Sequence, residues 1–135
     1  MSSNKSAEQN RAKYALGVID SHKSKDASWQ ERYSSYVKSL PATILTCGVG
    51  QAMASLLAKA GDDLSSPHGQ LYRDLEGWLC RNQGIFSSQA NLMTALTDAE
   101  MDTYLAAQAE ALAMMVWLKK FAVAFLKKAK GGGSD

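Results

Sequence analysis

The last quarter of the sequence constrains the fold most, because residues 97–129 contain no proline or glycine and can form one long helix. Thr97 and Glu100 have the spacing of a capping box, which predicts that the helix begins there. It would be about 48 Å long. Apolar residues occupy most of its circumference, so the helix must be central in its own bundle or bury a second face against another chain. We favour the partner interface, and ordinary core packing is the alternative.

The rest of the chain also predicts helices. No stretch alternates apolar and polar residues for long, and no Asn-Gly or Asp-Gly hairpin turn is present. A chain of 135 residues has the size of one domain. We therefore expect an all-α fold: a compact bundle of about five to six helices with a long C-terminal helix, formed by residues 7–129. Residues 1–6 and the glycine-rich residues 130–135 are expected to be flexible.

Capping boxes predict where the first two helices begin. Ser6 with Gln9 starts a helix that ends near His22, and Ser28 with Glu31 starts the second. In each box the side chains bind backbone N–H groups that have no partner within the helix. A short connector is expected between the two helices.

Proline and glycine predict the next boundaries. Pro41 disfavours helical geometry at the preceding residue and suits the first turn of a new helix. We therefore expect the second helix to end there and a third to run to about residue 59. Gly48 and Gly50 would lie inside this third helix, where the missing side chains allow another helix to approach closely.

Ser66 and Pro67 have the pattern of an N-cap followed by the first helical residue, and they predict a fourth helix. Gly84 is its expected end. A short helix is expected over residues 88–96.

Charge is divided unevenly along the chain. Residues 1–61 hold eight basic and four acidic side chains, and residues 62–116 hold two basic and eight acidic ones. Residues 117–130 hold five lysines and no acidic side chain. This segregation predicts basic surfaces on the first and last helices, which suit a polyanion, and an acidic middle that suits a basic neighbour. Scattered, solvated charge is the alternative interpretation.

Motifs for catalysis or metal binding are absent from the sequence. No phosphate-binding glycine loop or nucleophile elbow is present, and His22 and His68 lack the spacing of zinc ligands. We interpret both histidines as surface residues, and Cys47 and Cys80 as core thiols in a reducing compartment. The prediction is a protein without enzymatic activity, metal or cofactor.

The first residues lack the apolar core of a secretory signal, and the most apolar region, residues 111–126, is interrupted by Lys119 and Lys120. We expect no membrane span and a cytoplasmic location.

Three blocks of the sequence resemble one known family. They read NRAKYALGVI, YSSYVKSLPATILTCGVGQAMASLLAKAG and EALAMMVWLKKFAVAFLKK. In order and spacing they are similar to the small-subunit family of the type III-B Cmr complexes, which are CRISPR ribonucleoproteins that target RNA. The resemblance spans residues from about Arg11 to Lys128. Cys47 and Val49 depart from it, because the family pattern has asparagine and leucine at these positions.

The resemblance implies a non-catalytic helical subunit, present in several copies that stack into a minor filament beside guide RNA and target RNA. The implied partners are other Cmr subunits and further copies of the chain. Matching the blocks residue by residue, together with the charge distribution, gives six candidate phosphate contacts: Arg11, Lys13, Lys38, Lys119, Lys120 and Lys127. The expected contacts with a neighbouring copy are Trp117, Phe121 and Phe125.

Two other functions are compatible with the residues. A helical protein-binding adaptor would use the apolar last helix as a docking surface and would have no role with nucleic acid. Peripheral membrane attachment through the same helix would use its lysines and aromatic residues. We favour the RNA-supporting subunit over both.

Overall fold

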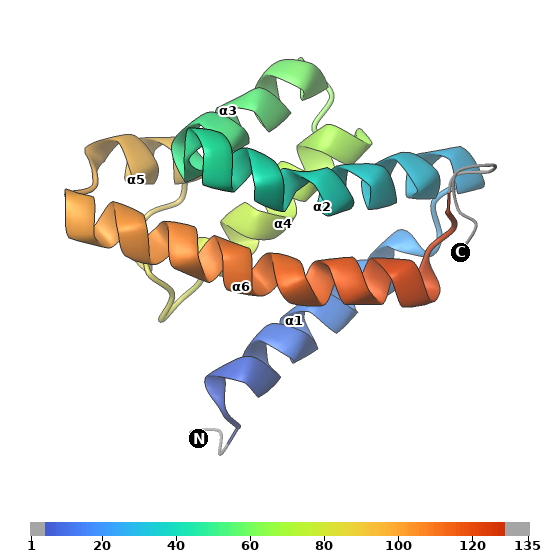
Figure 1. Cartoon of the computed structure of the whole chain (residues 1–135), viewed down its shortest axis with the longest axis horizontal. Helices are drawn as coiled ribbons and strands as arrows, with labels where there is room; N and C mark the ends of the chain where they lie inside the picture. Colours follow the sequence, from blue (N-terminus) through green and yellow to red (C-terminus); the bar gives the residue numbers. More distant parts are fainter. Residues whose placement is uncertain (1–4, 129–135) are drawn as a thin grey trace.

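The computed structural model of the chain describes residues 5–128, which form six helices and no strand. Figure 1 shows their arrangement. The prediction of an all-α bundle with a long C-terminal helix is confirmed. The helices are α1 (Ala7–His22), α2 (Ala27–Cys47), α3 (Val49–Ala60), α4 (Pro67–Leu79), α5 (Leu92–Asp98) and α6 (Met101–Phe125).

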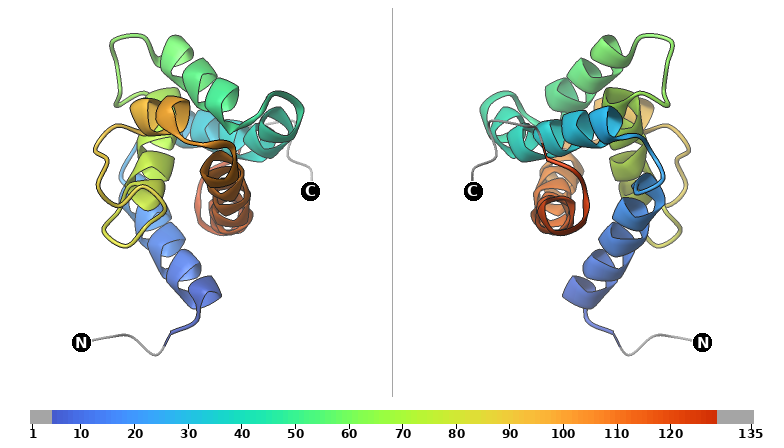
Figure 2. Two further views of the ribbon diagram at one scale, coloured as in Figure 1. Left: turned by 90° about the vertical axis from the view of Figure 1, so that its left-hand side faces the viewer. Right: turned by 90° about the vertical axis from the view of Figure 1, so that its right-hand side faces the viewer.

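The long helices α2 and α6 lie side by side, and the remaining helices pack around this pair. Helix α1 packs against α6 and its first turns extend away from the bundle, whereas α3 packs on α2 and α4 (Figures 1 and 2). All six helices contribute to the core. Its largest fully buried side chains include Ile19, Tyr33, Ile44, Met53, Leu71, Leu75, Leu79, Leu92, Met114, Met115 and Leu118.

Helix α6 is shorter than the sequence predicts, with 25 residues and a length of about 38 Å. It begins after Glu100 because Thr97 belongs to α5, where its hydroxyl donates to the Met93 carbonyl oxygen (2.9 Å). It ends at Phe125 because Leu126 has an extended backbone and is buried in the core. The prediction that the helix continues to residue 129 is wrong, because residues 126–128 are not helical.

The predicted boundary between α2 and α3 is wrong. Pro41 lies inside α2, and the helix continues through it to Cys47. The break comes at Gly48, whose φ of 88° is open to glycine and strained for other residues. The first amides of α3 bind side chains of α6: Val49 donates to Gln108 Oε1 (2.9 Å) and Gly50 donates to the Tyr104 hydroxyl (2.8 Å).

The close approach predicted at Gly48 and Gly50 is confirmed. A Cβ built on either residue would lie 3.0–3.1 Å from the hydroxyl oxygen of Tyr104. Helix α6 therefore lies directly against this backbone.

Other helix boundaries follow local caps with small shifts. Ser6 and Ser66 cap α1 and α4 as predicted, and their side chains accept from Gln9 N and Gly69 N. Helix α2 is capped by Asp26 rather than Ser28. Helix α4 ends at Leu79, before Gly84, and the following short helix begins at Leu92 after Asn91 instead of at residue 88.

A buried carboxylate, Asp74 on α4, connects three helices. Its Oδ2 accepts from the Tyr33 hydroxyl (2.6 Å) and lies 2.8 Å from His22 Nε2, and its backbone carbonyl accepts from the Tyr14 hydroxyl (2.7 Å). His22 is 3% exposed, so its interpretation as a surface histidine is wrong. Burial raises the pKa of the Tyr33 hydroxyl well above 10.0, and the Asp74 charge raises it further.

The two cysteines differ from each other. Cys47, at the end of α2, is exposed, so the prediction of a core thiol is wrong there; Cys80 is half-buried and packs against the core. Burial raises the pKa of the Cys80 thiol, and the charge of Glu76 adds to this shift.

We predict opposite effects for two glycine-to-alanine substitutions. Gly48→Ala should lower the free energy of unfolding by about 1–3 kcal/mol, because alanine is strained at this positive φ. Gly17→Ala is the matched control inside α1, where an added Cβ has no atom within 4 Å. It should raise stability by about 0.5–1 kcal/mol. Urea unfolding of both variants measures this, and equal effects would contradict the assigned helix break.

Candidate nucleic-acid interface

The α2–α6 pair sets the geometry of the candidate site. The two helices are antiparallel: the Lys127 amide, just after α6, donates to Gln30 Oε1 near the start of α2 (3.0 Å), while Gln108 and Tyr104 of α6 bind the backbone just after α2. Ser34 also reaches the Lys127 carbonyl oxygen (3.5 Å), so this side of α2 faces α6.

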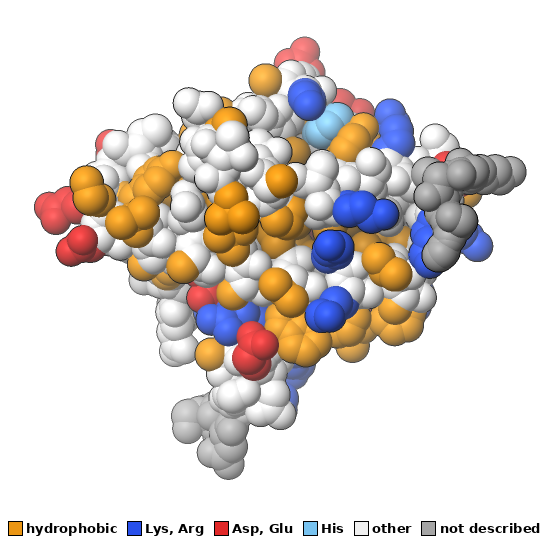
Figure 3. Space-filling view, viewed as in Figure 1, with side chains coloured by type: hydrophobic (Ala, Val, Ile, Leu, Met, Phe, Trp, Pro, Cys, Tyr) orange, Lys and Arg blue, Asp and Glu red, His pale blue; other side chains and the backbone are white. Residues whose placement is uncertain are grey.

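Four of the predicted phosphate contacts are exposed on this pair or just after α6, and we call them the basic face: Lys38, Lys119, Lys120 and Lys127. Lys38 follows Ser34 by four residues and therefore shares the α6 side of α2. The antiparallel register places it beside the turn of α6 that holds Lys119 and Lys120. Figure 3 shows Lys and Arg side chains gathered over α2 and the C-terminal half of α6.

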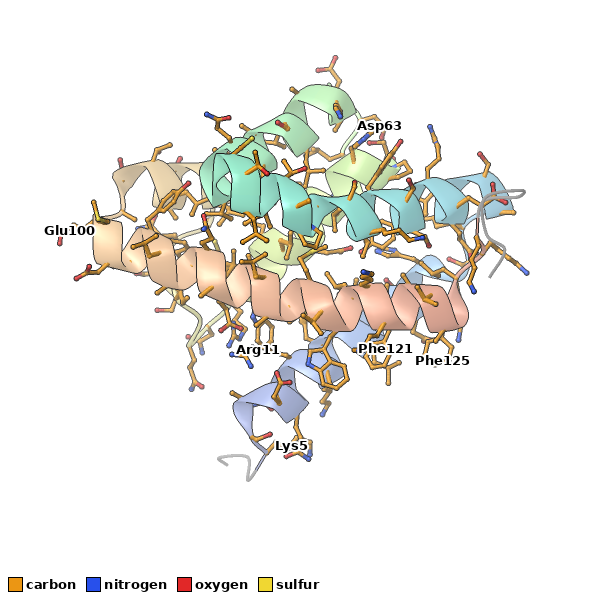
Figure 4. All side chains as sticks on the ribbon, viewed as in Figure 1. Lys5, Arg11, Asp63, Glu100, Phe121 and Phe125 are labelled. Atoms are coloured by element: carbon orange, nitrogen blue, oxygen red, sulfur yellow. The ribbon has the colours of Figure 1, made fainter. Side chains whose placement is uncertain are left out.

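Within residues 5–128, the lysines of the basic face have no anionic partner. No carboxylate of residues 5–128 lies within 4.0 Å of their ammonium groups. Acidic side chains gather instead at the other end of α6, where Figure 4 places Glu100. Positive charge without counter-charge is thus concentrated on one half of the α2–α6 surface.

Arg11 has a different environment from these lysines. Its Nε and Nη2 donate to the two carboxylate oxygens of Glu110 on α6 (2.7 and 2.9 Å), and its Nη1 donates to Glu8 (2.9 Å). Trp78 of α4 donates to the same Glu110 carboxylate (2.8 Å). This bidentate pair holds α1 on α6. A phosphate contact by Arg11 stays a prediction, and most of its donors already have acceptors.

The pKa values of the pair reflect this contact. The hydrogen bonds with Glu110 raise the pKa of Arg11, and the hydrogen bond from Arg11 lowers the pKa of Glu110 below its usual 4.5 despite partial burial. Both groups are therefore held in their charged forms.

Lys13 is exposed on α1 and projects from the side opposite Ala15, which is fully buried. Arg11 and Lys13 both lie on α1, so neither is part of the basic face.

The three predicted interface aromatics form a row on the α1 side of α6. The ring centroids of Trp117 and Phe121 are 5.6 Å apart, and those of Phe121 and Phe125 are 6.0 Å apart. Figure 4 shows Phe121 and Phe125 projecting together from α6. Helix α1 and the connector after it contact the two ends of the row: Trp117 donates to Glu8, and Lys23 lies over the Phe125 ring. Phe125 is still 49% exposed, and a contact with a neighbouring copy stays a prediction.

Helix α6 carries an exposed apolar stripe. Leu105, Val116 and Val123 are each about half exposed and lie on one side of the helix, next to Lys119 and Lys120. Leu45 on α2 is 70% exposed. The apolar circumference of α6 signalled such a surface, but the sequence alone could not show which side the bundle covers.

Residues 5–128 contain no group of three or more histidine, cysteine, aspartate or glutamate side chains placed to hold a metal ion. None of the helices in this range is long and apolar enough to cross a membrane.

The fold and the site define a class: a small all-helical protein with one basic, partly apolar face. A family model described as CRISPR-associated protein (Cas_Cmr5) matches residues 7–125. The chain belongs to this family, the small subunits of the Cmr complexes. The resemblance found in the sequence is confirmed, and family membership implies a place in a multi-subunit CRISPR complex.

We predict that the ion pair between Arg11 and Glu110 makes the stability of the protein depend on pH in the acid range. Because its pKa is lowered in the folded protein, its contribution is complete above pH 4.5 and is lost as pH falls below that value. Glu110→Gln should cost about 1–2 kcal/mol at pH 7. The difference in the free energy of unfolding between this variant and the parent should shrink as the pH is lowered below 4.5. Urea unfolding across this range measures it.

Glu100→Gln is the matched control, because the Glu100 side chain makes no capping hydrogen bond. This variant should keep the acid response of the parent. A constant difference between Glu110→Gln and the parent at all pH values would contradict the assigned ion pair.

Proposed function

We propose that this chain is the small subunit of a type III-B Cmr ribonucleoprotein and that its basic face supports RNA through backbone phosphates. The observation that carries the proposal is the set of four exposed lysines on two antiparallel helices and just after the second, without a carboxylate partner among residues 5–128. Family membership supplies the CRISPR context.

Phosphate binding is the chemistry that this face suits best. Flexible lysines bind phosphate as point charges, without reading bases, and each contact releases counterions from the nucleic acid. Aromatic side chains that could stack bases lie on the α1 side of α6, partly covered by Glu8 and Lys23. The proposed binding is therefore independent of sequence and sensitive to salt.

The proposed role is structural. Target cleavage is assigned to other subunits of the complex, and this chain positions the RNA for them. This part of the proposal rests on the family rather than on the geometry of the chain.

We also propose that several copies stack end to end. The two ends of α6 carry opposite charge, with Glu100 and Asp102 at its start and Lys127 and Lys128 just after its end. Complementary ends favour a head-to-tail contact, which continues into a filament when it does not close into a ring. The half-exposed Phe125 lies near the basic end and supplies apolar area to such a contact.

RNA binding by the basic face is tested with Lys119→Gln/Lys120→Gln. If each lysine neutralises one phosphate, the slope of log affinity against log salt should fall by about 1.4 for single-stranded RNA. Fluorescence anisotropy at several salt concentrations measures the slope, and circular dichroism checks that helicity is unchanged. Arg73→Gln, on the exposed side of α4, is the control and should leave the slope unchanged. An unchanged slope in the double variant would remove these lysines from the interface.

Stacking is tested by native mass spectrometry of the chain co-expressed with Cmr backbone subunits and guide RNA. The parent should be present in two or more copies per particle. Glu100→Lys/Asp102→Lys should retain fewer copies, because the proposed contact would then join like charges. Asp20→Lys/Asp62→Lys changes the same charge elsewhere and should keep the parent count. One copy in every particle would contradict stacking.

A protein-binding adaptor is the second candidate function. It is favoured by the exposed stripe of Leu105, Val116 and Val123, which could dock on an apolar partner. Its binding would change little with salt, so the slope measured above separates the two functions.

A further inference from the structure

A cleft on the other side of α2 from Lys38 has the features of a second binding site. It lies between α2, α3 and the start of α4 and has a volume of about 140 Å³. Leu40 and Leu56 form part of its wall. Its polar lining consists of Tyr36, Ser39, Thr43, Ser55, Lys59 and His68.

The cleft has a fixed shape on one side because two rings stack there. The ring centroids of Tyr36 and His68 are 3.6 Å apart, and the ring planes differ by 15°. His68 is the second residue of α4, so the positive end of that helix dipole also lies at the cleft.

Positive charge at the cleft has no counter-charge within the described chain. Lys59 on α3 and Arg32 on α2 both act on His68, and among residues 5–128 no carboxylate pairs with either. Burial, then Lys59 and Arg32, lower the pKa of His68. The acidic Asp63, in the preceding loop, accepts hydrogen bonds from Ser65 N and Oγ instead.

Hydrogen-bonding groups at the cleft also lack partners. Within residues 5–128, the Tyr36 and Ser55 hydroxyls, the Lys59 ammonium and the His68 ring nitrogens make no hydrogen bond. The Ser39 and Thr43 hydroxyls reach only carbonyl oxygens of their own helix, at 3.3 and 3.5 Å. Convergent donors with uncompensated positive charge select an oxyanion.

We propose that this cleft binds a phosphoryl group, with the Lys59 ammonium as its charged ligand and the His68 ring and the Ser55 hydroxyl as further hydrogen-bond donors. The volume of about 140 Å³ is below the range of about 300–1,000 Å³ typical of sites for whole drug-sized ligands, so one such group is the unit that is recognised.

The phosphoryl group has two possible sources, an RNA backbone and a free or terminal phosphate. The cleft and the basic face lie on opposite sides of the same helix, because Lys38 shares the α6 side of α2 with Ser34 whereas Ser39 lines the cleft. Figure 3 shows histidine and basic side chains above α2 on the same face of the molecule as the basic side chains over α6. A strand on the basic face could therefore cross α2 and place a phosphate in the cleft.

The test follows the ring resonances of the two histidines by NMR while inorganic phosphate is added to the whole chain. His22 is an internal control, because it is 3% exposed and bonded to Asp74. The His68 signals should shift and saturate with a dissociation constant of about 1–10 mM, while those of His22 stay fixed. The bound anion should also raise the pKa of His68, since it favours the charged imidazole.

Lys59→Gln should weaken the binding of phosphate by about five- to tenfold, because it removes one charged donor. Lys38→Gln is the matched control: an exposed lysine of the same region on the other side of α2. It should leave the phosphate titration unchanged. Both variants change exposed side chains, and circular dichroism checks that they fold.

Two further probes distinguish the sources of the group. A short oligoribonucleotide without a 5′ phosphate that shifts His68 identifies a backbone phosphate, whereas a response only to inorganic phosphate or to the 5′-phosphorylated strand identifies a free or terminal one. Either result supports the site. An equal response to an unphosphorylated nucleoside, or no response of His68 to any probe, overturns it. The Lys119→Gln/Lys120→Gln test is independent of these outcomes.

Discussion

The arrangement of the helices depends on one buried charge, the carboxylate of Asp74. A buried carboxylate is costly unless hydrogen bonds satisfy it, and here Tyr33 of α2, His22 of α1 and Gln70 of α4 surround its two oxygens. Because the partners come from three helices, the bonds fix α1 and α2 relative to α4. Helix α6 then packs on the surface that α1 and α2 form, so the position of its lysines follows from a polar contact far from them.

The sequence predicted those parts of the fold that depend on local contacts. Ser6 and Ser66 cap the amides three residues on, so a short pattern identifies them. The break at Gly48 was missed because the acceptors for the first amides of α3, on Tyr104 and Gln108, lie more than fifty residues away. Local rules favoured Pro41 as the break. The tertiary bonds favour Gly48.

In the candidate site, too, local patterns could be predicted from the sequence, whereas contacts between residues far apart in the sequence could not. The lysines could be identified by counting charge, which predicted a basic surface on the last helix. Their grouping with Lys38 depends on the antiparallel register of α2 and α6, which no local pattern contains. Arg11 had the appearance of a free cation in the sequence, yet its partner Glu110 is 99 residues away. Burial of His22 was hidden in the same way by the distance to Asp74.

The side chain of Gln30 acts as a clasp at the C-terminal end of the basic face. Its amide nitrogen donates to the carbonyl oxygens of Lys23 and Lys25, in the connector before α2, while its oxygen accepts from the Lys127 amide after α6. One buried amide thus fastens the chain leaving α6 to the chain entering α2. The backbone positions from which the lysines of the two helices project are therefore fixed before any ligand arrives, so contact with an extended polyanion would order the lysine side chains but not the helices that carry them.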